Sequence, residues 1–289
     1  MRYACIEAHR GEYAIAKMCR WLDVSRAGYY KWRRREPGAR ERRRLLVAQA
    51  LLIAFKQFKR RYGAPRLAVE LQESGVPCSV NHIAKLMVEH DLRAKNGKNY
   101  KYFPNVQAIN HVSANLLARR FTASRPNEKW VSDITYIKLE RGFVYLAVIM
   151  DLYSRKIIGW SLDTTMTNQL IMDAFNMAVA SRQVEPGLIL HSDRGVQYRS
   201  GEYQHLLNRK KIRPSMSRKG NCWDNAVMES FFARLKVESI HGEVIEGKSD
   251  AYSCVFEYIE LFYNSVRRHS TNGYLSPNQY EQNYYEMCA

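Results

Sequence analysis

The sequence lacks any long apolar run and any grouped cysteines. No stretch holds 18 consecutive apolar residues, and the start shows no secretory signal of basic residues followed by an apolar segment. The six cysteines are scattered, without a CxxC pair and without histidines at zinc-finger spacing. These absences argue against a membrane-spanning protein, a disulfide scaffold and a zinc finger, so we expect a soluble cytosolic chain with reduced thiols.

Acidic residues are scarce in the first part of the chain. Residues 1–120 contain 25 Lys+Arg against 9 Asp+Glu, whereas residues 121–289 contain 20 against 19, and the net charge is +17. A basic module is therefore joined to a nearly neutral one that is rich in aromatic residues. This distribution indicates a polyanionic partner, with nucleic acid favoured over an anionic membrane surface.

The first pattern in the basic part lies at residues 13–35. A helix is predicted to end near Trp21, a short turn follows, and Ser25 is a natural N-cap for a second helix, which is aromatic and basic. This order, a helix, a short turn and a basic helix, is typical of a helix-turn-helix module. An unrelated helical hairpin has the same order of elements.

A similar order returns at residues 62–92. Pro65 opens a predicted helix that Gly75 closes, and Ser79 caps a second helix with apolar residues at helical spacing. Two helix-turn-helix units in tandem therefore fit the basic part of the chain.

The character of the chain changes after about residue 125. Residues 129–139 and 142–154 are rich in β-branched and aromatic residues and predict strands, the second apolar enough to be buried on both faces. Beyond them we expect a strand at 155–162, a helix at 168–183, a strand at 187–193, a helix at 200–211 and a short strand at 212–217. Three adjacent strands followed by alternating helices and strands predict a mixed sheet with helices packed on it.

Three acids of the second part have unusual positions. Asp133 lies in mid-strand among apolar and β-branched residues, where an uncompensated charge is costly. Asp193 lies where a predicted strand ends, which is where α/β sheets usually bind ligands. Glu229 lies on a predicted helix. Taken singly, the three are also compatible with a strand-edge acid, a turn acid and a surface acid.

The helix predicted at residues 221–236 has a core face and a polar face. At about 100° per residue its apolar side chains gather on one side, and Asn225, Glu229 and Lys236 gather on the other. Glu229 and Lys236 lie roughly two turns apart in one line. An ordinary amphipathic helix with a solvated charged face has the same pattern, so the helix alone decides nothing.

The spacing of the acids is more specific. Between Asp193 and Glu229 lie 35 residues, and Lys236 follows Glu229 by seven. In this spacing the sequence resembles the DDE transposases and retroviral integrases. The resemblance narrows to the OrfB product of bacterial insertion sequences of the insertion-sequence-three family, over essentially the full length. It rests on the segments MRYACIEAHRGEYAIAKMCRWLDVSRAGYYKW, YGAPRL, DITYI, HSDRGVQY, NAVMESFFARLKVE and YNSVRRHSTNGYLSPNQY.

The resemblance implies an α/β fold, with an RNase H-like mixed five-stranded sheet and flanking helices preceded by all-α helix-turn-helix DNA-binding modules. With the patterns above, it predicts five regions: a helix-turn-helix region at 1–45, a second helix-turn-helix-like region at 46–93, a basic linker at 94–124, an integrase-like catalytic core at 125–245 and a C-terminal helical segment at 246–289.

The expected chemistry explains the acidic residues. In-line substitution at a phosphodiester uses two divalent ions roughly 3.5–4 Å apart, one at the attacking and one at the leaving oxygen. Mg²⁺ prefers carboxylate oxygens, and Mn²⁺ is the expected substitute. We expect Asp133 to bridge both ions, Asp193 to complete one site and Glu229 the other. Asp151 and Asp163 fit better as a turn acid and a strand-end acid.

The predicted partner of the chain is double-stranded DNA, as terminal inverted repeats and as target. The expected contacts are Arg26, Tyr29, Tyr30, Lys31, Arg33, Arg34, Arg66, Asn81, His82, Lys85, Asn225, Lys236, Arg267 and Arg268. Some have a second interpretation: Asn225 as a capping or turn residue, and Arg267 and Arg268 as residues that pack the C-terminal segment. His191, two residues before Asp193, fits a structural histidine better than one that touches DNA.

The expected function is a DNA transposase that cleaves insertion-sequence ends with divalent metal and transfers the 3′-OH strand. Paired ends imply at least a dimer on DNA, and the family implies a bacterial protein of the cytoplasm and nucleoid with no membrane partner. The family also implies a partner in the upstream-frame OrfA product, joined by frameshifting. The alternatives are a catalytically silent DNA-binding regulator or partner subunit, and an RNase H-type nuclease that cuts without joining.

Overall fold

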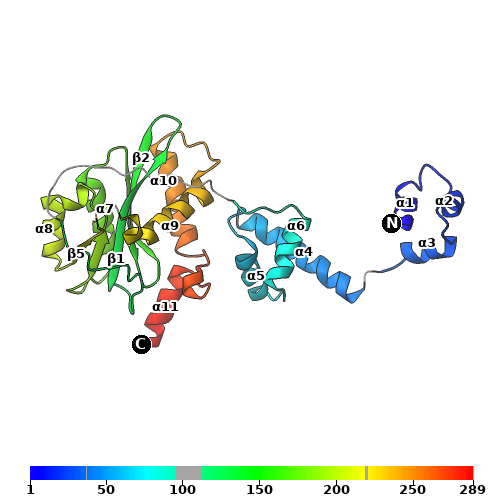
Figure 1. Cartoon of the computed structure of the whole chain (residues 1–289), viewed down its shortest axis with the longest axis horizontal. Helices are drawn as coiled ribbons and strands as arrows, with labels where there is room; N and C mark the ends of the chain where they lie inside the picture. The colour runs from blue at the N-terminus through cyan, green and yellow to red at the C-terminus, as the bar shows by residue number, and fades with distance from the viewer. Residues whose placement is uncertain (37, 96–111, 219–220, 289) are drawn as a thin grey trace. The chain divides into compact units, whose positions relative to one another are not determined.

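The chain divides into two compact units (Figure 1). The computed structural model describes residues 1–36, 38–95, 112–218 and 221–288. One unit comprises Met1–Lys59 and Leu67–Leu92, and the other comprises Arg60–Arg66 and Arg93–Ala289. Within the described residues, no helix is both long and apolar enough to cross a membrane. Much of the predicted basic linker, residues 96–111, lies outside the described residues.

Three short helices begin the chain: α1 (Arg2–Ala8), α2 (Ile15–Trp21) and α3 (Arg26–Arg33). They bury a small core that includes Met18 and Tyr29. The predicted helix end at Trp21 is confirmed, and so is the predicted N-cap, because Ser25 Oγ accepts a 2.9 Å hydrogen bond from the Gly28 N–H. α1 lies before the helix-turn-helix pattern predicted at residues 13–35, and it packs into the same small core.

Three further helices follow: α4 (Ala39–Gln57), α5 (Ala64–Glu73) and α6 (Val80–Glu89). The predicted helix around Pro65 is α5, and Gly75, with a φ of +79°, follows its end as expected. Ser79 caps α6 by accepting a hydrogen bond from the His82 N–H, as predicted. Among the described residues before the sheet, the regular elements are therefore all α-helices.

The second unit is built on five strands: β1 (Lys129–Lys138), β2 (Phe143–Asp151), β3 (Ile157–Asp163), β4 (Ile189–Ser192) and β5 (Arg213–Met216). Their order in the sheet is β3-β2-β1-β4-β5. The first three are antiparallel neighbours, and β4 and β5 are added in parallel beside β1. The predicted mixed five-stranded sheet is thus confirmed, with β1 between an antiparallel and a parallel neighbour.

Five helices accompany the sheet: α7 (Asn168–Ala180), α8 (Gly201–Arg209), α9 (Ala226–Leu235), α10 (Lys248–Phe256) and α11 (Pro277–Cys288). Trp130 of β1 packs in one core with residues of α7 and α8. Because strand residues alternate between faces, Val131 and Asp133 point to the other face, and α9 packs on this strand. α7 lies tightly on β3, since a Cβ at Gly159 would be 2.2 Å from the Ala174 carbonyl oxygen.

Short helical segments connect these elements: η1 (Gln197–Arg199), η2 (Cys222–Asn225), η3 (Lys236–Ile240), η4 (Glu257–Tyr263) and η5 (Ser270–Asn272). η3 and η4 are π-helical and continue α9 and α10. Glu238 of η3 is buried and bonded to Arg267 and to the Tyr258 hydroxyl. Arg61 donates to the Glu238 carbonyl oxygen and pairs with Glu257, which holds residues 60–66 in the second unit.

Candidate active site

The three predicted acids come from neighbouring elements of the second unit. Asp133 lies in the middle of β1, and Asp193 directly follows β4. These strands are parallel and pair Val131 with His191, so Asp133 and Asp193 each lie two residues further along and face the same side. Glu229 lies in the first turn of α9, which packs on β1. The topology therefore brings a strand acid, a strand-end acid and a helix acid to one region.

Asp133 is half-buried and surrounded by negative charge. Its Oδ1 accepts a 2.9 Å hydrogen bond from the Ile134 N–H. Burial raises the pKa of Asp133 well above its ordinary value, and the charges of Asp193 and Glu229 raise it further. Asp133 therefore lies close enough to both other acids for their charges to act on it, and a cation beside Asp133 would offset that repulsion.

The turn after β4 orients Asp193. Its Oδ1 accepts a 2.8 Å hydrogen bond from the Gly195 N–H. Burial raises the pKa of Asp193, opposed by this hydrogen bond and by the Arg199 guanidinium. A Cβ at Gly195 would lie 2.9 Å from the same Oδ1, so any larger residue in this turn must displace the carboxylate.

α9 presents Glu229 outward while its other face is buried. Met228, Phe231 and Leu235 are buried, as predicted for the core face, and Phe232 joins them. Glu229 is exposed, yet neighbouring protein desolvates it enough to raise its pKa. Among the residues that the structure describes, no three acid, histidine or cysteine side chains are close enough to hold a metal ion. The carboxylates share a region without forming a closed ligand cage.

Asn225 connects the strand and the helix of the site. It is buried, and its Nδ2 donates a 3.3 Å hydrogen bond to the Ser132 carbonyl oxygen, next to Asp133. Asn225 ends the turn η2 and occupies the N-cap position of α9, as the capping or turn interpretation predicted, but its side chain makes no capping hydrogen bond. In the described part of the chain its Oδ1 has no hydrogen-bond partner, which leaves a buried amide oxygen beside the carboxylates.

Lys236 lies where α9 widens into the π-helical segment η3. Its side chain is buried, with Nζ 4.6 Å from the centre of the Tyr136 ring. Burial lowers the pKa of Lys236 to about 8, although the nearby Asp133 charge acts in the opposite direction. The alternative of an ordinary solvated charged face therefore does not describe Lys236, which is buried near Asp133.

The turn η2 contains a buried carboxylate, Asp224, whose hydrogen-bond partners the sequence did not reveal. Asp224 is fully buried and accepts hydrogen bonds from Arg218, Arg119 and Asn115. The Arg218 hydrogen bond holds the pKa of Asp224 well below its ordinary value, against the effect of burial. Trp223, beside it, is 68% exposed. An exposed indole presents a flat aromatic surface to solvent.

His191 has the structural role that the sequence favoured. It is fully buried on β4, with its ring nitrogens 2.8 Å from Ser215 Oγ and 3.1 Å from Ser217 Oγ. Burial lowers its pKa to about 4, so the imidazole is neutral and joins β4 to β5.

Several residues expected to contact DNA are instead inside the protein. Arg267 is 3% exposed and bonded to Glu238, and Arg268 is buried with a hydrogen bond to the Tyr274 carbonyl oxygen. Arg66 is partly buried and donates a 2.9 Å hydrogen bond to the Arg268 carbonyl oxygen. Burial removes Arg267 and Arg268 from direct DNA contact, and their packing interpretation is the correct one.

The helices of the first unit expose most of the other predicted DNA contacts. The prediction that Tyr29 contacts DNA is wrong, because this side chain is fully buried in the core of α1 to α3, where its hydroxyl donates a hydrogen bond to Glu7. Tyr30 and His82 are partly exposed, and the remaining side chains are exposed: Arg26, Lys31, Arg33, Arg34, Asn81 and Lys85.

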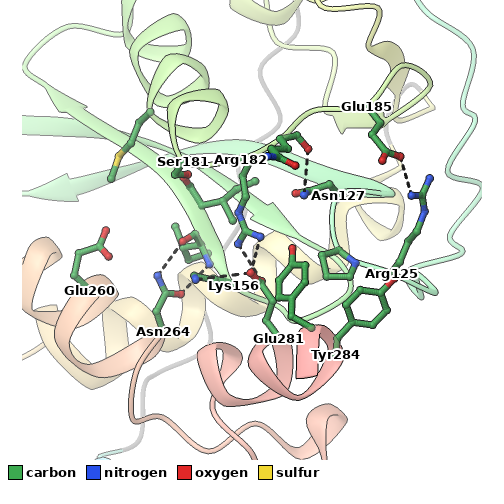
Figure 2. A pocket seen from close by; sticks show the side chains of 16 residues that line it. Arg125, Asn127, Lys156, Ser181, Arg182, Glu185, Glu260, Asn264, Glu281 and Tyr284 are labelled. Carbon is green, nitrogen blue, oxygen red and sulfur yellow. Dashed lines mark hydrogen bonds and ion pairs between the residues drawn. The ribbon is translucent and has the colours of Figure 1, made fainter. Parts of the chain in front are cut away.

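A polar pocket of about 630 Å³ lies in the second unit, and none of the three acids lines it (Figure 2). Arg182 donates two hydrogen bonds to Glu281, at 2.6 and 3.0 Å, and Lys156 lies 3.9 Å from the same carboxylate. Asn264 bonds to the backbone of Ile157. These contacts attach α11 to the region of β3 and α7. The pocket therefore lies where the C-terminal segment packs on this region, and it is not the candidate active site.

Three family models match the sequence. A model described as an integrase core domain matches residues 123–222, and a second integrase core domain model matches residues 229–284. An HTH-like domain model matches residues 41–100.

Among solved structures, similarity is found to an intasome of simian T-cell lymphotropic virus in complex with PP2A regulatory subunit B56 gamma. It has a TM-score of 0.46 and 17% identity, covering 80% of this chain and 73% of the other. The HTLV-2 integrase catalytic core domain in complex with magnesium has a TM-score of 0.40 and 16% identity, covering 55% of this chain and 98% of the other.

Two relatives match nearly the whole chain. Transposase InsF for insertion sequence IS3A of Escherichia coli (strain K12) is 46% identical over 283 residues, covering 97% of this chain and 98% of the relative. The insertion element IS600 uncharacterized 31 kDa protein of Shigella sonnei is 38% identical over 272 residues, covering 94% of this chain and all of the relative. With its integrase core and HTH-like domain, the chain belongs to the transposase family of InsF from the IS3 insertion sequences and is a polynucleotidyl transferase.

Proposed function

We propose that this transposase cleaves the ends of an insertion sequence in a divalent-metal-dependent reaction and joins the freed 3′-OH to DNA. The proposed catalytic residues are Asp133, Asp193 and Glu229. One observation carries the proposal: the parallel pairing of β1 and β4 puts Asp133 and Asp193 on the same side of the sheet, and α9, which carries Glu229, packs on β1. Mutually repelling carboxylates do not stabilise a fold, and a cation that they bind together gives them a function.

The donor set fits a hard divalent cation. All the donors are oxygens, which Mg²⁺ prefers, and the unpartnered Oδ1 of Asn225 adds one more in the same place. Asp133, Asp193 and Glu229 would hold two Mg²⁺ ions, which Mn²⁺ could replace. When bound, the ions supply charge neutralisation at phosphorus and lower the pKa of the attacking water.

The reaction consists of two substitutions of one kind. Water attacks the phosphodiester at the element end, and the bond from phosphorus to the 3′-oxygen breaks to leave a 3′-OH. That 3′-OH then attacks a second phosphodiester and displaces its 3′-oxygen, so one bond forms for each that breaks. Because both steps are in-line substitutions, one site serves both without a covalent protein intermediate.

Side chains around the acids have supporting roles in this proposal. The Gly195 N–H orients the Asp193 carboxylate, and Asn225 fixes the start of α9 against β1. Lys236, buried over the Tyr136 ring, contributes a positive charge near Asp133, and its burial argues against the direct DNA contact that the sequence suggested.

The terminal inverted repeats are the proposed ligand of the first unit. Exposed basic and polar side chains of α3 and α6 supply contacts to phosphates and base edges, namely Arg26, Tyr30, Lys31, Arg33, Arg34, Asn81, His82 and Lys85. Joining two ends requires at least two copies of the chain on DNA. The OrfA product of an upstream frame is the proposed additional partner, and the bacterial cytoplasm and nucleoid are the proposed location.

The test is strand transfer on a labelled duplex that carries the element's end, with Mg²⁺ and with a chelator. Glu229→Gln is compared with Glu202→Gln, which changes an exposed glutamate on α8. DNA binding of each variant is first matched by gel shift. We expect joined product from the wild type and Glu202→Gln in Mg²⁺ only, and none from Glu229→Gln.

Three outcomes would contradict the proposal. If the wild type binds the DNA end but joins no strands, even after the OrfA product is added, the chain is a DNA-binding regulator. Cleavage of an RNA–DNA hybrid without joining would indicate an RNase H-type nuclease. Joining by Glu229→Gln would remove this acid from the site.

A further inference from the structure

The helix α4 is apolar on two opposite sides. One side is buried in the first unit and consists of Val47, Ala48, Leu51, Ala54 and Phe55. The other side is solvent-exposed, with Leu45 at 52%, Leu46 at 54%, Leu52 at 42% and Ile53 at 68% of their full exposure. Single exposed leucines are ordinary, but four large aliphatic side chains on one helix face form a patch of the kind that marks an interface.

The four exposed side chains line up. At about 100° per residue they fall within an arc of about 120°, with Gln49 at its centre. Gln49 is exposed as well. We call Leu45, Leu46, Gln49, Leu52 and Ile53 the α4 face.

The α4 face has a symmetrical sequence. Leu45 and Leu46 precede Gln49 by four and three residues, and Leu52 and Ile53 follow it by three and four. An antiparallel copy crossing at Gln49 would therefore place Leu45 against Ile53 and Leu46 against Leu52. The two Gln49 amides would meet on the two-fold axis, where each can donate to the other's carbonyl oxygen. Such a self-matching patch is what an isologous contact between two identical subunits requires.

We propose that two copies of the chain pair through the α4 face, antiparallel, with the Gln49 side chains at the crossing point. This pairing rests on the proposed function, because the α4 face would be the surface through which two copies bound to paired DNA ends meet. A polar residue at the centre of an apolar stripe also sets register and orientation, as buried polar residues do in paired helices.

The size of the patch predicts a weak pair. From their exposed fractions, the four aliphatic side chains offer roughly 400 Å² per copy, about half of the ~800 Å² that each partner buries in a standard interface. Such a contact is mostly open in dilute solution. It closes when two copies are held on one pair of DNA ends, because the effective concentration is then high.

The charges next to the patch predict how the pair responds to salt. Arg42 and Lys56 lie on the same side of α4, one beyond each end of the α4 face. In the antiparallel pair Arg42 of one copy approaches Lys56 of the other. Like charges repel, so added salt should strengthen the pair by screening. Docking of an acidic helix from another protein would respond in the opposite way.

Sedimentation velocity of the full chain, free of DNA, is the first test. We expect weak self-association that increases with salt and weakens about tenfold in Leu46→Lys, because each copy loses the burial of a leucine. Val88→Lys, which changes a side chain 81% exposed on α6, is the matched control and should associate like the wild type. A monomer under all conditions, or association that falls with salt, would overturn the proposal.

Disulfide trapping tests the geometry. Under mild oxidation on paired-end DNA, Gln49→Cys should form a covalent dimer, because residues on a two-fold axis come within disulfide reach. Wild type and Val88→Cys measure the background from exposed Cys5 and Cys288. Trapping no greater than this background would refute the antiparallel contact. The test is made in a Glu229→Gln background, so it succeeds or fails independently of strand transfer.

Discussion

The buried ion pair between Glu238 and Arg267 should stabilise the second unit and contribute nothing to DNA binding. Both side chains are 3% exposed and make two hydrogen bonds, at 2.8 and 2.7 Å, while the Tyr258 hydroxyl donates to the same carboxylate at 3.0 Å. Burial by itself would lower the pKa of Arg267, but the Glu238 carboxylate raises it above its ordinary value. The guanidinium therefore stays charged inside the protein.

Removal of one partner leaves the other charge buried and unpaired. Arg267→Met or Glu238→Gln alone should lower the free energy of unfolding by about 3–5 kcal/mol, the cost of breaking a buried pair. The double variant removes both charges and should recover most of that loss. Hydrogen–deuterium exchange of the β1 and β2 amides reports this free energy for the second unit separately from the helices of the first.

Arg125→Met is the matched control. Arg125 pairs with Glu185 at 2.8 Å, but both side chains are more than half exposed, so its loss should leave the free energy of unfolding nearly unchanged. Normal sheet protection in Arg267→Met together with weaker DNA binding would refute the structural role and restore Arg267 as a DNA contact.

Three further predictions follow from the site and its surroundings. Gly195→Ala should displace the Asp193 carboxylate and reduce strand joining about 100-fold. Gly201→Ala is the control, because a Cβ there meets no other atom, and it should join strands like the wild type. Equal joining by the two variants would contradict the close contact between Gly195 and Asp193. Trp223→Ala should weaken binding to an element end by about 1–3 kcal/mol in gel shifts, and the similarly exposed Tyr252→Ala should not; a loss in both would indicate a nonspecific effect. Burial raises the pKa of Asp151 to about 6. A raised carboxyl pKa stabilises the folded state below the unfolded pKa, and this contribution is lost as pH rises through 6. The wild type should therefore lose about 2 kcal/mol of its free energy of unfolding between pH 4 and 7 through Asp151. Asp151→Asn should lack this slope in urea unfolding, and an unchanged slope would assign it to other groups.

The predictions that held depend on local chemistry. Ser25 and Ser79 cap helices because a hydroxyl three residues before an N–H needs only the adjacent backbone. The strand containing Asp133 and the strand ending before Asp193 follow from composition and turn residues, and the parallel pairing of β1 and β4 then places both acids on one side.

The features that sequence could not reveal depend on residues far apart in the chain. Asp224 is bonded to Arg119, 105 residues away, and no short pattern joins them. Arg267 resembles a surface cation until its partner Glu238 is placed beside it. Tyr29 lies on a basic helix, but α1, which lay outside the predicted pattern, supplies the Glu7 that its hydroxyl contacts.

Lys236 shows a different limit of sequence reasoning. Its position on the polar face of the helix left open whether the side chain is solvated. The structure buries Lys236 over the ring of Tyr136 on β1, a contact that the spacing of residues within one helix does not contain.

The most direct test of the central claim is Mn²⁺ binding, measured by electron paramagnetic resonance on the full chain bound to a duplex element end. The account predicts that the wild type binds Mn²⁺, that Asp133→Asn loses this binding, and that Asp163→Asn retains it. Asp163 is the control because it is exposed at the end of β3 and paired with Lys248 at 2.8 Å. Equal Mn²⁺ binding by the wild type and Asp133→Asn, with equal occupancy of DNA, would contradict a shared metal site at Asp133, Asp193 and Glu229.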